Sequence, residues 1–210
     1  MTNSTVMKSG AGFLYDEATG DIVGVKDSDG GEMFFVYGQV WDDLDSPIII
    51  RTTGPAIPTL ETVAGNLTAP QWAVNDVNMC EGQELPHCWK EGSEFVWHIH
   101  VLTNGVDSTA RYLRFEIEWS YAMSHGVFST PETITSADLA IPANTPDRTH
   151  IPFEIGRRTI TNGVIATHMW PRLKRVASVG TAPSADPFCT MLQAHILCDT
   201  LGSRAITTKN

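Results

Sequence analysis

The sequence is short of charged residues, and of basic residues above all. Lysine, arginine, aspartate and glutamate make up 18% of the 210 residues, and 24 acidic against 14 basic side chains give a formal net charge of −10. Binding through nucleic-acid phosphates needs a basic face, so we expect no nucleic-acid partner. The nearest candidate face is Arg157-Arg158 with Arg172, Lys174 and Arg175. We interpret these residues as ion-pairing or subunit-contact residues rather than as an anion site.

Long apolar runs and closely spaced cysteines are also missing. No segment approaches 18 continuous apolar residues, so we expect no contact with a membrane. The first ten residues, MTNSTVMKSG, lack the apolar run of a secretory signal. The four cysteines, Cys80, Cys88, Cys189 and Cys198, have no CxxC spacing, which argues against a zinc ribbon or a thioredoxin-type site. We expect four free thiols, with Cys198 serving as a small buried residue.

The common motifs of catalysis and cofactor binding are absent. The chain has no P-loop, no GxGxxG after a strand and no GxSxG. Residues 27–31, DSDGG, offer oxygen donors but lack a full calcium loop, so we interpret them as a turn. Glu116 and Glu118 have the residue type of a glycosidase pair, but they share a wet strand face with Arg114, which favours cross-strand ion pairs. We therefore expect no enzyme and no cofactor.

What the sequence does have is many short strand patterns separated by turn residues. The clearest runs over residues 111–121, where Leu113, Phe115, Ile117 and Trp119 alternate with polar residues. A second strand ends in His98-Ile99-His100, and Asn104-Gly105 lies between the two, so we predict one long hairpin. Further strands are predicted at 48–50, 150–155, 163–169, 173–179 and 190–199. The pattern predicts an all-β fold, a β-sandwich or jelly roll with an N-terminal β-hairpin arm.

The first part of the chain is predicted to form a separate unit. We place an N-terminal arm at residues 1–38 and the body at 39–210. After a loose tail at 1–10, residues 11–37 are expected to form three short strands, which cannot build much core alone. The arm should therefore lie on the body, on a neighbouring subunit or on a larger assembly. Its candidate docking residues are Phe13, Tyr15, Ile22, Val25, Phe34 and Phe35; the alternative is that they fasten a local hairpin to the body.

One histidine pair raises the question of a metal. His98 and His100 share one strand face, and two such histidines bind iron, manganese or zinc when a carboxylate completes a facial triad. Gly92 and the two histidines match the opening of a cupin signature, but Asn104 and Gly105 stand where that signature has its glutamate. A third ligand would have to come in space, from His125, His150, His168 or His195. We assign no metal and expect both imidazoles to hydrogen-bond across strands or to pack against Trp97, Trp119 or a neighbouring subunit.

Several motifs together resemble a family of tailed-phage and prophage structural proteins, encoded among head or tail genes. They are Gly12-Phe13-Leu14-Tyr15-Asp16, Thr19-Gly20, Val23-Gly24-Val25, Asp29-Gly30, Val40-Trp41-Asp42-Asp43-Leu44, Glu84-Leu85-Pro86-His87, Trp89-Lys90-Glu91-Gly92-Ser93, His98-Ile99-His100, Phe115-Glu116-Ile117-Glu118-Trp119, Arg172-Leu173-Lys174-Arg175 and Asp199-Thr200-Leu201-Gly202-Ser203-Arg204. The most specific piece is LPH-x-WKEGS-x4-HIH. Two departures are Val101-Leu102, where the family has a tryptophan, and the partial match at 194–199.

The resemblance implies a virion protein with a sandwich or jelly-roll body and no catalytic residues. Folding in the bacterial cytoplasm would suit free cysteines. The leading hypothesis is a capsid decoration or head-fibre protein that binds the major capsid protein through its arm and forms a homo-oligomer, with a trimer favoured over a dimer. The alternative is a tail-fibre or receptor-binding module. Its loops 103–110 and 122–148 would meet a host glycan, with Trp41, Trp72 or Trp89 as stacking platforms. A cupin-type metalloenzyme using His98 and His100 is the third hypothesis.

Overall fold

The protein divides into two compact units, residues 1–40 and residues 41–210. The computed structural model describes residues 3–8, 11–16, 22–26, 32–34, 40–51, 53–199 and 207, and before residue 40 it describes the strand backbone alone. Across these described residues, no helix is long and apolar enough to cross a membrane.

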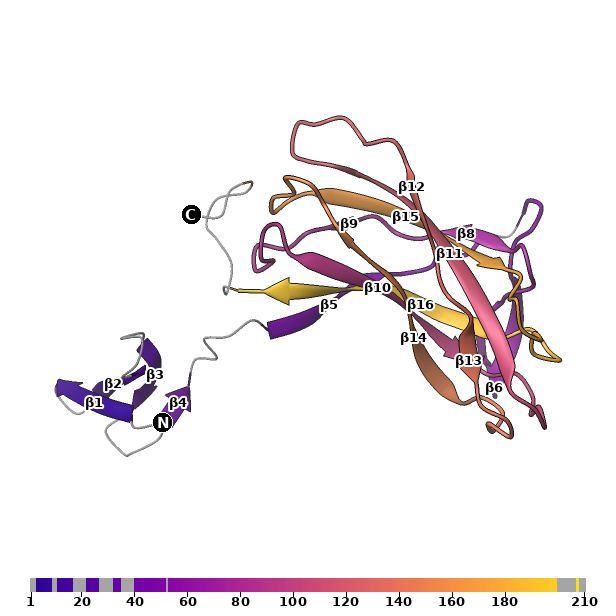
Figure 1. The fold of residues 1–210 in the computed structure, drawn as a ribbon, viewed down its shortest axis with the longest axis horizontal. Coiled ribbons are helices and arrows are strands. Elements are labelled where there is room, and N and C mark those ends of the chain that lie inside the picture. The colour runs from indigo at the N-terminus through magenta and orange to yellow at the C-terminus, as the bar shows by residue number, and fades with distance from the viewer. Residues whose placement is uncertain are drawn as a thin grey trace. The chain divides into compact units, whose positions relative to one another are not determined.

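The N-terminal unit is a four-stranded antiparallel sheet in the order β1-β2-β3-β4 (Figure 1). Its strands are β1 (Asn3–Lys8), β2 (Ala11–Asp16), β3 (Ile22–Lys26) and β4 (Glu32–Phe34). The loose tail predicted at 1–10 is wrong for residues 3–8, which pair along the whole of β2 from Lys8↔Ala11 to Asn3↔Asp16. Only Ser9 and Gly10 separate these strands, and two residues is the commonest hairpin length.

The body consists of two antiparallel sheets. The first, called here the β10 sheet, has the order β14-β10-β16-β7-β6, and β5 also pairs with β16. Its strands are β5 (Val40–Ser46), β6 (Thr59–Ala64), β7 (Leu67–Gln71), β10 (Glu94–Leu102), β14 (His150–Thr159) and β16 (Phe188–Cys198). Within this sheet, β5 and β16 pair although they come from opposite ends of the body's sequence.

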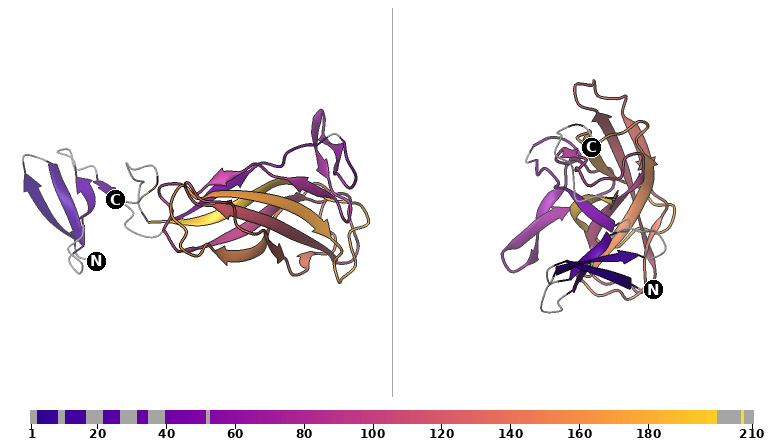
Figure 2. Two further views of the ribbon diagram at one scale, coloured as in Figure 1. Left: turned by 90° about the horizontal axis from the view of Figure 1, so that it is seen from above. Right: turned by 90° about the vertical axis from the view of Figure 1, so that its left-hand side faces the viewer.

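The second sheet, called the β11 sheet, has the order β12-β11-β15-β8, with β13 on β11 and β9 on β15. Its strands are β8 (Val77–Met79), β9 (Gln83–Glu84), β11 (Arg111–Ala122), β12 (Glu132–Thr135), β13 (Leu139–Ile141) and β15 (His168–Val176). From above, β15 in orange passes over β16 in yellow (Figure 2). The predicted all-β sandwich is confirmed.

The core lies between the two sheets and is rich in aromatic side chains. Phe95 and Trp97 of β10 meet Trp119 of β11 edge-on, with ring centroids 5.3 Å and 6.1 Å apart. Phe115 and Ile117 of β11 are also fully buried. Burying one such side chain stabilises the fold by about 1.5–3 kcal/mol. The predicted alternation of β11 is confirmed, because its odd positions from 113 to 119 are buried and its even positions are partly exposed.

The predicted hairpin between β10 and β11 is wrong. The two strands belong to different sheets, β10 pairing with β14 and β16 and β11 with β12, β13 and β15. Residues 103–110 connect one sheet to the other, and the chain bends at Gly105, whose φ is 80°. The physical reason is that both strands have an aromatic side. Facing sheets bury these two sides against each other, whereas a hairpin would leave both needing a third layer.

Three further strand predictions need correction. The strands predicted at 163–169 and 173–179 are one strand, β15, which runs through Pro171. On one edge of β15, residues 168–169 pair with β9 and residues 172–174 pair with β8. Pro171 lies between these two stretches, so its missing N–H interrupts no ladder bond to β8 or β9. The strand predicted at 48–50 is reduced to one bridge, Ile48↔Cys80.

Candidate functional site

The outer face of the β10 sheet carries four histidines from three neighbouring strands. They are His98 and His100 of β10, His150 of β14 and His195 of β16. On β10, strand alternation places His98 and His100 on the outer face, because the neighbouring residues Trp97 and Ile99 point inward and are fully buried in the core. This group is called the histidine face. The shared face predicted for His98 and His100 is therefore confirmed.

Gln193 of β16 links the histidines. Its side-chain Oε1 accepts from Nε2 of His98 at 2.8 Å and from Nε2 of His100 at 2.5 Å, while its Nε2 donates to Asp45 Oδ1 at 2.6 Å. His100 Nδ1 lies 2.7 Å from His150 Nε2, and these two rings stack with centroids 4.9 Å apart. The bond to Asp45 orients the amide, so its oxygen faces the imidazoles. The expected cross-strand hydrogen bonds of His98 and His100 are confirmed.

Strand β5 adds a carboxylate and an aromatic ring to the same face. Asp43 Oδ1 lies 2.7 Å from His195 Nδ1 and 3.8 Å from His98 Nε2. The Trp41 ring stacks on His195 with centroids 5.0 Å apart and an interplanar angle of 15°. Odd-numbered residues of β5 thus face outward, whereas Leu44 packs against the core and Ser46 is buried.

Burial decides the protonation of the most enclosed imidazole. The pKa of His98 is lowered chiefly because burial disfavours the charged ring, and the neighbouring imidazoles of His100 and His195 act in the same direction. The hydrogen bond to Gln193 and the charge of Asp43 oppose this shift. His98 is therefore a neutral imidazole at neutral pH. One of its ring nitrogens carries a proton and the other has a free lone pair.

Three side chains of this face bring metal-ligating atoms together. Asp43, His98 and His195 each offer one ligand atom, and these atoms all lie within 4.8 Å of one another. The pair considered from the sequence, His98 with His100, is not this group. Of the possible third ligands, His150 and His195 lie on the histidine face, while His168 belongs to the β11 sheet and His125 follows β11. The sequence pointed to His195 only as one of four candidates and did not single out Asp43.

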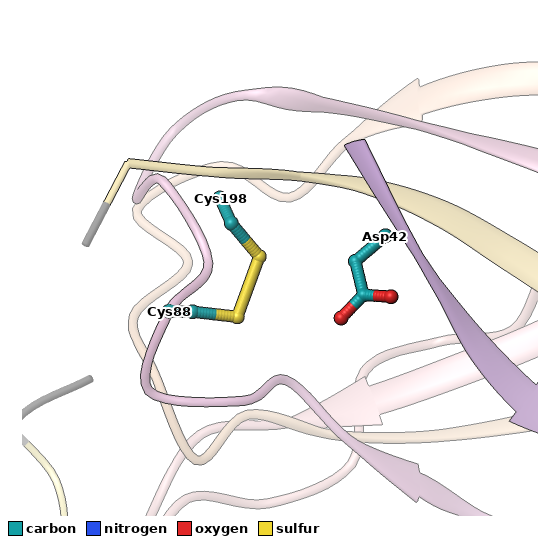
Figure 3. Close-up of side chains that lie close together, drawn as sticks. All are labelled: Asp42, Cys88 and Cys198. Atoms are coloured by element: carbon teal, nitrogen blue, oxygen red, sulfur yellow. A yellow bond between two sulfur atoms is a disulfide. The ribbon is translucent and has the colours of Figure 1, made fainter. Parts of the chain in front are cut away.

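A second close group lies on the other side of β5. Cys88 and Cys198 form a disulfide, and the Asp42 carboxylate projects beside it (Figure 3). The expectation of four free thiols is therefore wrong for this pair and confirmed for Cys80 and Cys189, which are buried. Bonded sulfurs are not thiolate ligands, so this group offers no metal site in the disulfide state.

The backbone explains the disulfide. Trp89 bridges to Cys198, the Lys90 N–H donates to the Leu197 carbonyl at 2.7 Å, and the Asp199 N–H donates to the Cys88 carbonyl at 3.0 Å. These bonds hold the two cysteine Cα atoms 4.8 Å apart, within the range that a disulfide needs. The 110 residues between them hide the pairing in the sequence. The prediction that Cys198 is buried is confirmed.

The candidate docking residues lie in the N-terminal unit. Phe13 and Tyr15 are in β2, Ile22 and Val25 are in β3, and Phe34 ends β4. The structure describes their backbone alone, and Phe35 lies outside the described residues. Their role in docking stays a prediction.

The prediction that three tryptophans could serve as stacking platforms is wrong for two of them. Trp72 and Trp89 are completely buried, because they fill the core rather than face solvent. Trp41 is 45% exposed but lies on His195. The predicted glycan loop 122–148 contains the strands β12 and β13.

An exposed aromatic group on the β11 sheet was missed from the sequence. Phe128, His168 and Trp170 have ring centroids 5.9–6.4 Å apart. Phe128 and Trp170 are 44% and 48% exposed. His168 and Trp170 are two residues apart on one strand, a signal of a shared face that the prediction of two separate strands here concealed.

The four arginines of the candidate basic face form ion pairs. Arg172 pairs with Glu118 at 2.6 Å, Arg157 with Glu154 at 2.8 Å and Arg175 with Asp186. The interpretation of these arginines as ion-pairing residues is confirmed, and so is the one for Glu118.

Comparison with known proteins provides little. No protein-family model matches the sequence, and the curated proteins contain no match. Among solved structures, the chain is similar to the CBM22-1–GH10 modules of Clostridium thermocellum endo-1,4-beta-D-xylanase 10B, complexed with xylohexaose. The TM-score is 0.32 at 14% identity, over 79% of this chain and 27% of that one, so this chain spans about a quarter of that protein. At this level the likeness supports no functional assignment.

Proposed function

We propose that this protein is a non-enzymatic structural component of a tailed-phage virion, a capsid decoration or head-fibre protein. The observation that carries the proposal is the division of the chain at residue 40 into a small β unit and a β-sandwich body. Four short strands bury little apolar surface alone. Such a unit gains stability by docking on a larger surface, and the major capsid protein is the surface that we propose.

The most specific motif of the phage resemblance also supports a structural role. Leu85 and Trp89 of this segment are fully buried, and the Glu91 carboxylate accepts a hydrogen bond from the Ile165 N–H at 3.1 Å. Trp89 also bridges to the end of β16. The motif residues thus hold the strand ends of the body together, which suits a scaffold whose function is to bind and reinforce.

In this proposal the body forms a homo-oligomer on the virion, with a trimer favoured and a dimer possible. A trimer suits three-fold positions of a shell. Each copy would bury additional surface between capsid subunits, and this added binding energy would oppose the pressure of the packaged DNA. The net charge of −10 suits a protein that contacts other proteins rather than DNA.

Co-sedimentation of the full-length protein with tail-free phage heads tests the proposal. We expect binding to heads, and we expect it to be lost when Phe13→Asp and Phe34→Asp are introduced together. The matched control is Trp170→Ala, which changes an exposed aromatic residue of the body and should leave head binding intact. Circular dichroism would establish that each variant is folded. Absence of head binding by the unchanged protein would contradict the proposal.

A receptor-binding module is the second candidate, favoured by the exposed aromatic group of Phe128, His168 and Trp170. Aromatic rings at a surface stack on sugar faces, and the exposed Trp170 ring offers such a platform. In this case the protein would sediment with intact host cells rather than with heads. Trp170→Ala would then abolish cell binding, whereas Trp41→Ala on the other sheet would retain it.

A further inference from the structure

We propose that Asp43, His98 and His195 form a binding site for one divalent transition-metal ion of the zinc class. The site lies on the outer face of the β10 sheet and clips β5 to β10 and β16. It is distinct from the docking arm and does not rest on the proposed virion function.

The donor atoms have the spacing that an ion requires. Asp43 Oδ1 lies 2.7 Å from His195 Nδ1 and 3.8 Å from His98 Nε2. Ligand atoms about 2.0–2.1 Å from a tetrahedral zinc ion lie about 3.4 Å from one another. The two observed distances fall on either side of this value. Asp43 Oδ1 and His195 Nδ1 must separate by about 0.7 Å, Asp43 Oδ1 and His98 Nε2 must approach by about 0.4 Å, and the ligand atoms of His98 and His195 lie within 4.8 Å of one another. Side-chain rotations of this size bring the three donors around one ion.

The donor types select the ion. Two imidazole nitrogens and one carboxylate oxygen suit zinc, nickel, cobalt or copper rather than calcium or magnesium, which prefer oxygen ligands. Asp45 adds a second carboxylate beside the site, bonded to Gln193. The acidic charge of these two side chains favours a dication over an anion.

The strands hold the three side chains in place before any ion binds. His98 stands directly opposite Gln193 in the β10–β16 register, and His195 lies two residues further along β16. The Trp41 ring stacks on the His195 imidazole and restricts its rotation. Sites built on paired strands keep their geometry better than sites built on loops, because the backbone ladder fixes each Cα.

Binding exchanges two hydrogen bonds for coordination bonds, because the ion replaces the proton that His195 Nδ1 donates to Asp43 Oδ1 and the proton that His98 Nε2 donates to Gln193 Oε1. Each imidazole then carries its single proton on the other ring nitrogen. His98 Nε2 must leave Gln193 Oε1, which lies 2.8 Å away, and turn toward Asp43. Gln193 keeps its bonds to His100 and Asp45 in the process. His100 and His150 then remain as a separate hydrogen-bonded pair outside the ligand set. They provide a stringent control, because they are histidines of the same face that the proposal excludes.

The site keeps at least one coordination position open to solvent. Asp43 and His195 have side chains 45% and 40% exposed, and three protein ligands leave a fourth tetrahedral position for water. The consequence for the fold is local. β5 is the first strand of the body, and the ion would join it to two strands that come from residues 94–102 and 188–198.

Calorimetric titration of the full-length, untagged protein with zinc, after stripping with a chelator, tests the proposal. We expect one ion per chain, a higher unfolding temperature in its presence, and at least tenfold weaker binding for Asp43→Asn and for His195→Ala. The control variants His150→Ala and His168→Ala should bind as the unchanged protein does. Circular dichroism without metal would verify that every variant is folded.

Cobalt(II) provides the second measurement, because its visible spectrum reports the ligands and their geometry. We expect a d–d band of low-symmetry, near-tetrahedral coordination in the unchanged protein and in His150→Ala, and its loss in Asp43→Asn. The absence of zinc binding would overturn the proposal. Equal weakening by His150→Ala and by His195→Ala would overturn it as well, because the ion would then lie among the histidines at large.

Discussion

The outer faces of the two sheets are built by the same alternation but carry different chemistry. On the β11 sheet, Glu118 stands directly opposite Arg172 and pairs with it at 2.6 Å. On the β10 sheet, imidazoles and carboxylates gather around Gln193. The β10 sheet has exposed ion pairs as well, such as that of Arg157 with Glu154, but it also concentrates imidazoles, which bind protons. Outward-facing polar residues are thus a general consequence of a sandwich, whereas their identity distinguishes a solvated surface from a site.

The inner side of the sandwich provides the largest contrast with both outer faces. Trp119→Ala removes a ring that is 2% exposed and contacts Phe95 and Trp97, so we expect a loss of about 3–5 kcal/mol in the free energy of unfolding. Trp170→Ala, on the outer face of the same sheet and 48% exposed, should lose less than about 1 kcal/mol. Urea denaturation measures both. Equal losses would contradict the assignment of inner and outer faces.

A buried thiol of the core should make the stability of the fold depend on pH. Burial raises the pKa of the Cys80 thiol from 9.0 to about 12. Above pH 9 the unfolded chain releases this proton while the folded protein keeps it, so the folded state binds more protons and stability falls as pH rises. Between pH 9 and 12 we expect a contribution on the order of 1 kcal/mol per pH unit.

Comparison with Cys80→Ala isolates this contribution from other alkaline effects. The difference in unfolding free energy between the two proteins should decline with pH above 9, measured by denaturant titration at several pH values. A difference that is constant from pH 8 to 11 would show that Cys80 ionises equally in both states.

The linking amide of the histidine face gives an intermediate effect. Gln193→Leu removes the acceptor of His98 and His100 and the donor to Asp45, so we expect a loss of about 1–2 kcal/mol. Gln193→Glu keeps the acceptor oxygens but places a second carboxylate beside Asp45, and its loss should be similar. Thermal unfolding of the metal-free protein provides the measurement. A stability unchanged by Gln193→Leu would mean that the bonds of this residue contribute nothing net.

The ion pair of the β11 sheet should contribute least. A double-mutant cycle of Glu118→Gln and Arg172→Met should give a coupling energy of about 0.2–1 kcal/mol, because both side chains are partly exposed. The coupling should shrink when ionic strength is raised, as salt screens exposed charges. A coupling that is above this range and insensitive to salt would remove the contrast between the two outer faces.

The sequence predicted local features well and neighbours poorly. Alternation was enough to predict the buried side of β11 and the common outward face of His98 and His100, because both depend only on the period of a strand. It could not predict that β10 and β11 lie in facing sheets, since a turn dipeptide fits either connection. Asp43 reaches His195 only because β5 pairs with β16, and this pairing joins residues about 150 positions apart.

The disulfide also depends on a pairing between distant residues that the sequence does not predict. Cys88 lies in a loop and Cys198 at the end of the last strand of the body, and only the bridge of Trp89 to that strand brings them together. The sequence does not predict the burial of Trp72 and Trp89, because both lie outside the strand patterns whose alternation would indicate an inward or outward direction. Residue type and spacing predict which groups have chemistry, and strand order decides which of them meet.

Nuclear magnetic resonance of the side-chain nitrogens of all seven histidines, recorded on the full-length protein during a zinc titration, tests the central claim most directly. The account predicts that the ring nitrogens of His98 and His195 shift or exchange first, at one equivalent of zinc, while those of His125 and His168 stay in place. Equal responses from all histidines, or a first response from His168 on the β11 sheet, would contradict the claim that the metal site lies on the β10 sheet.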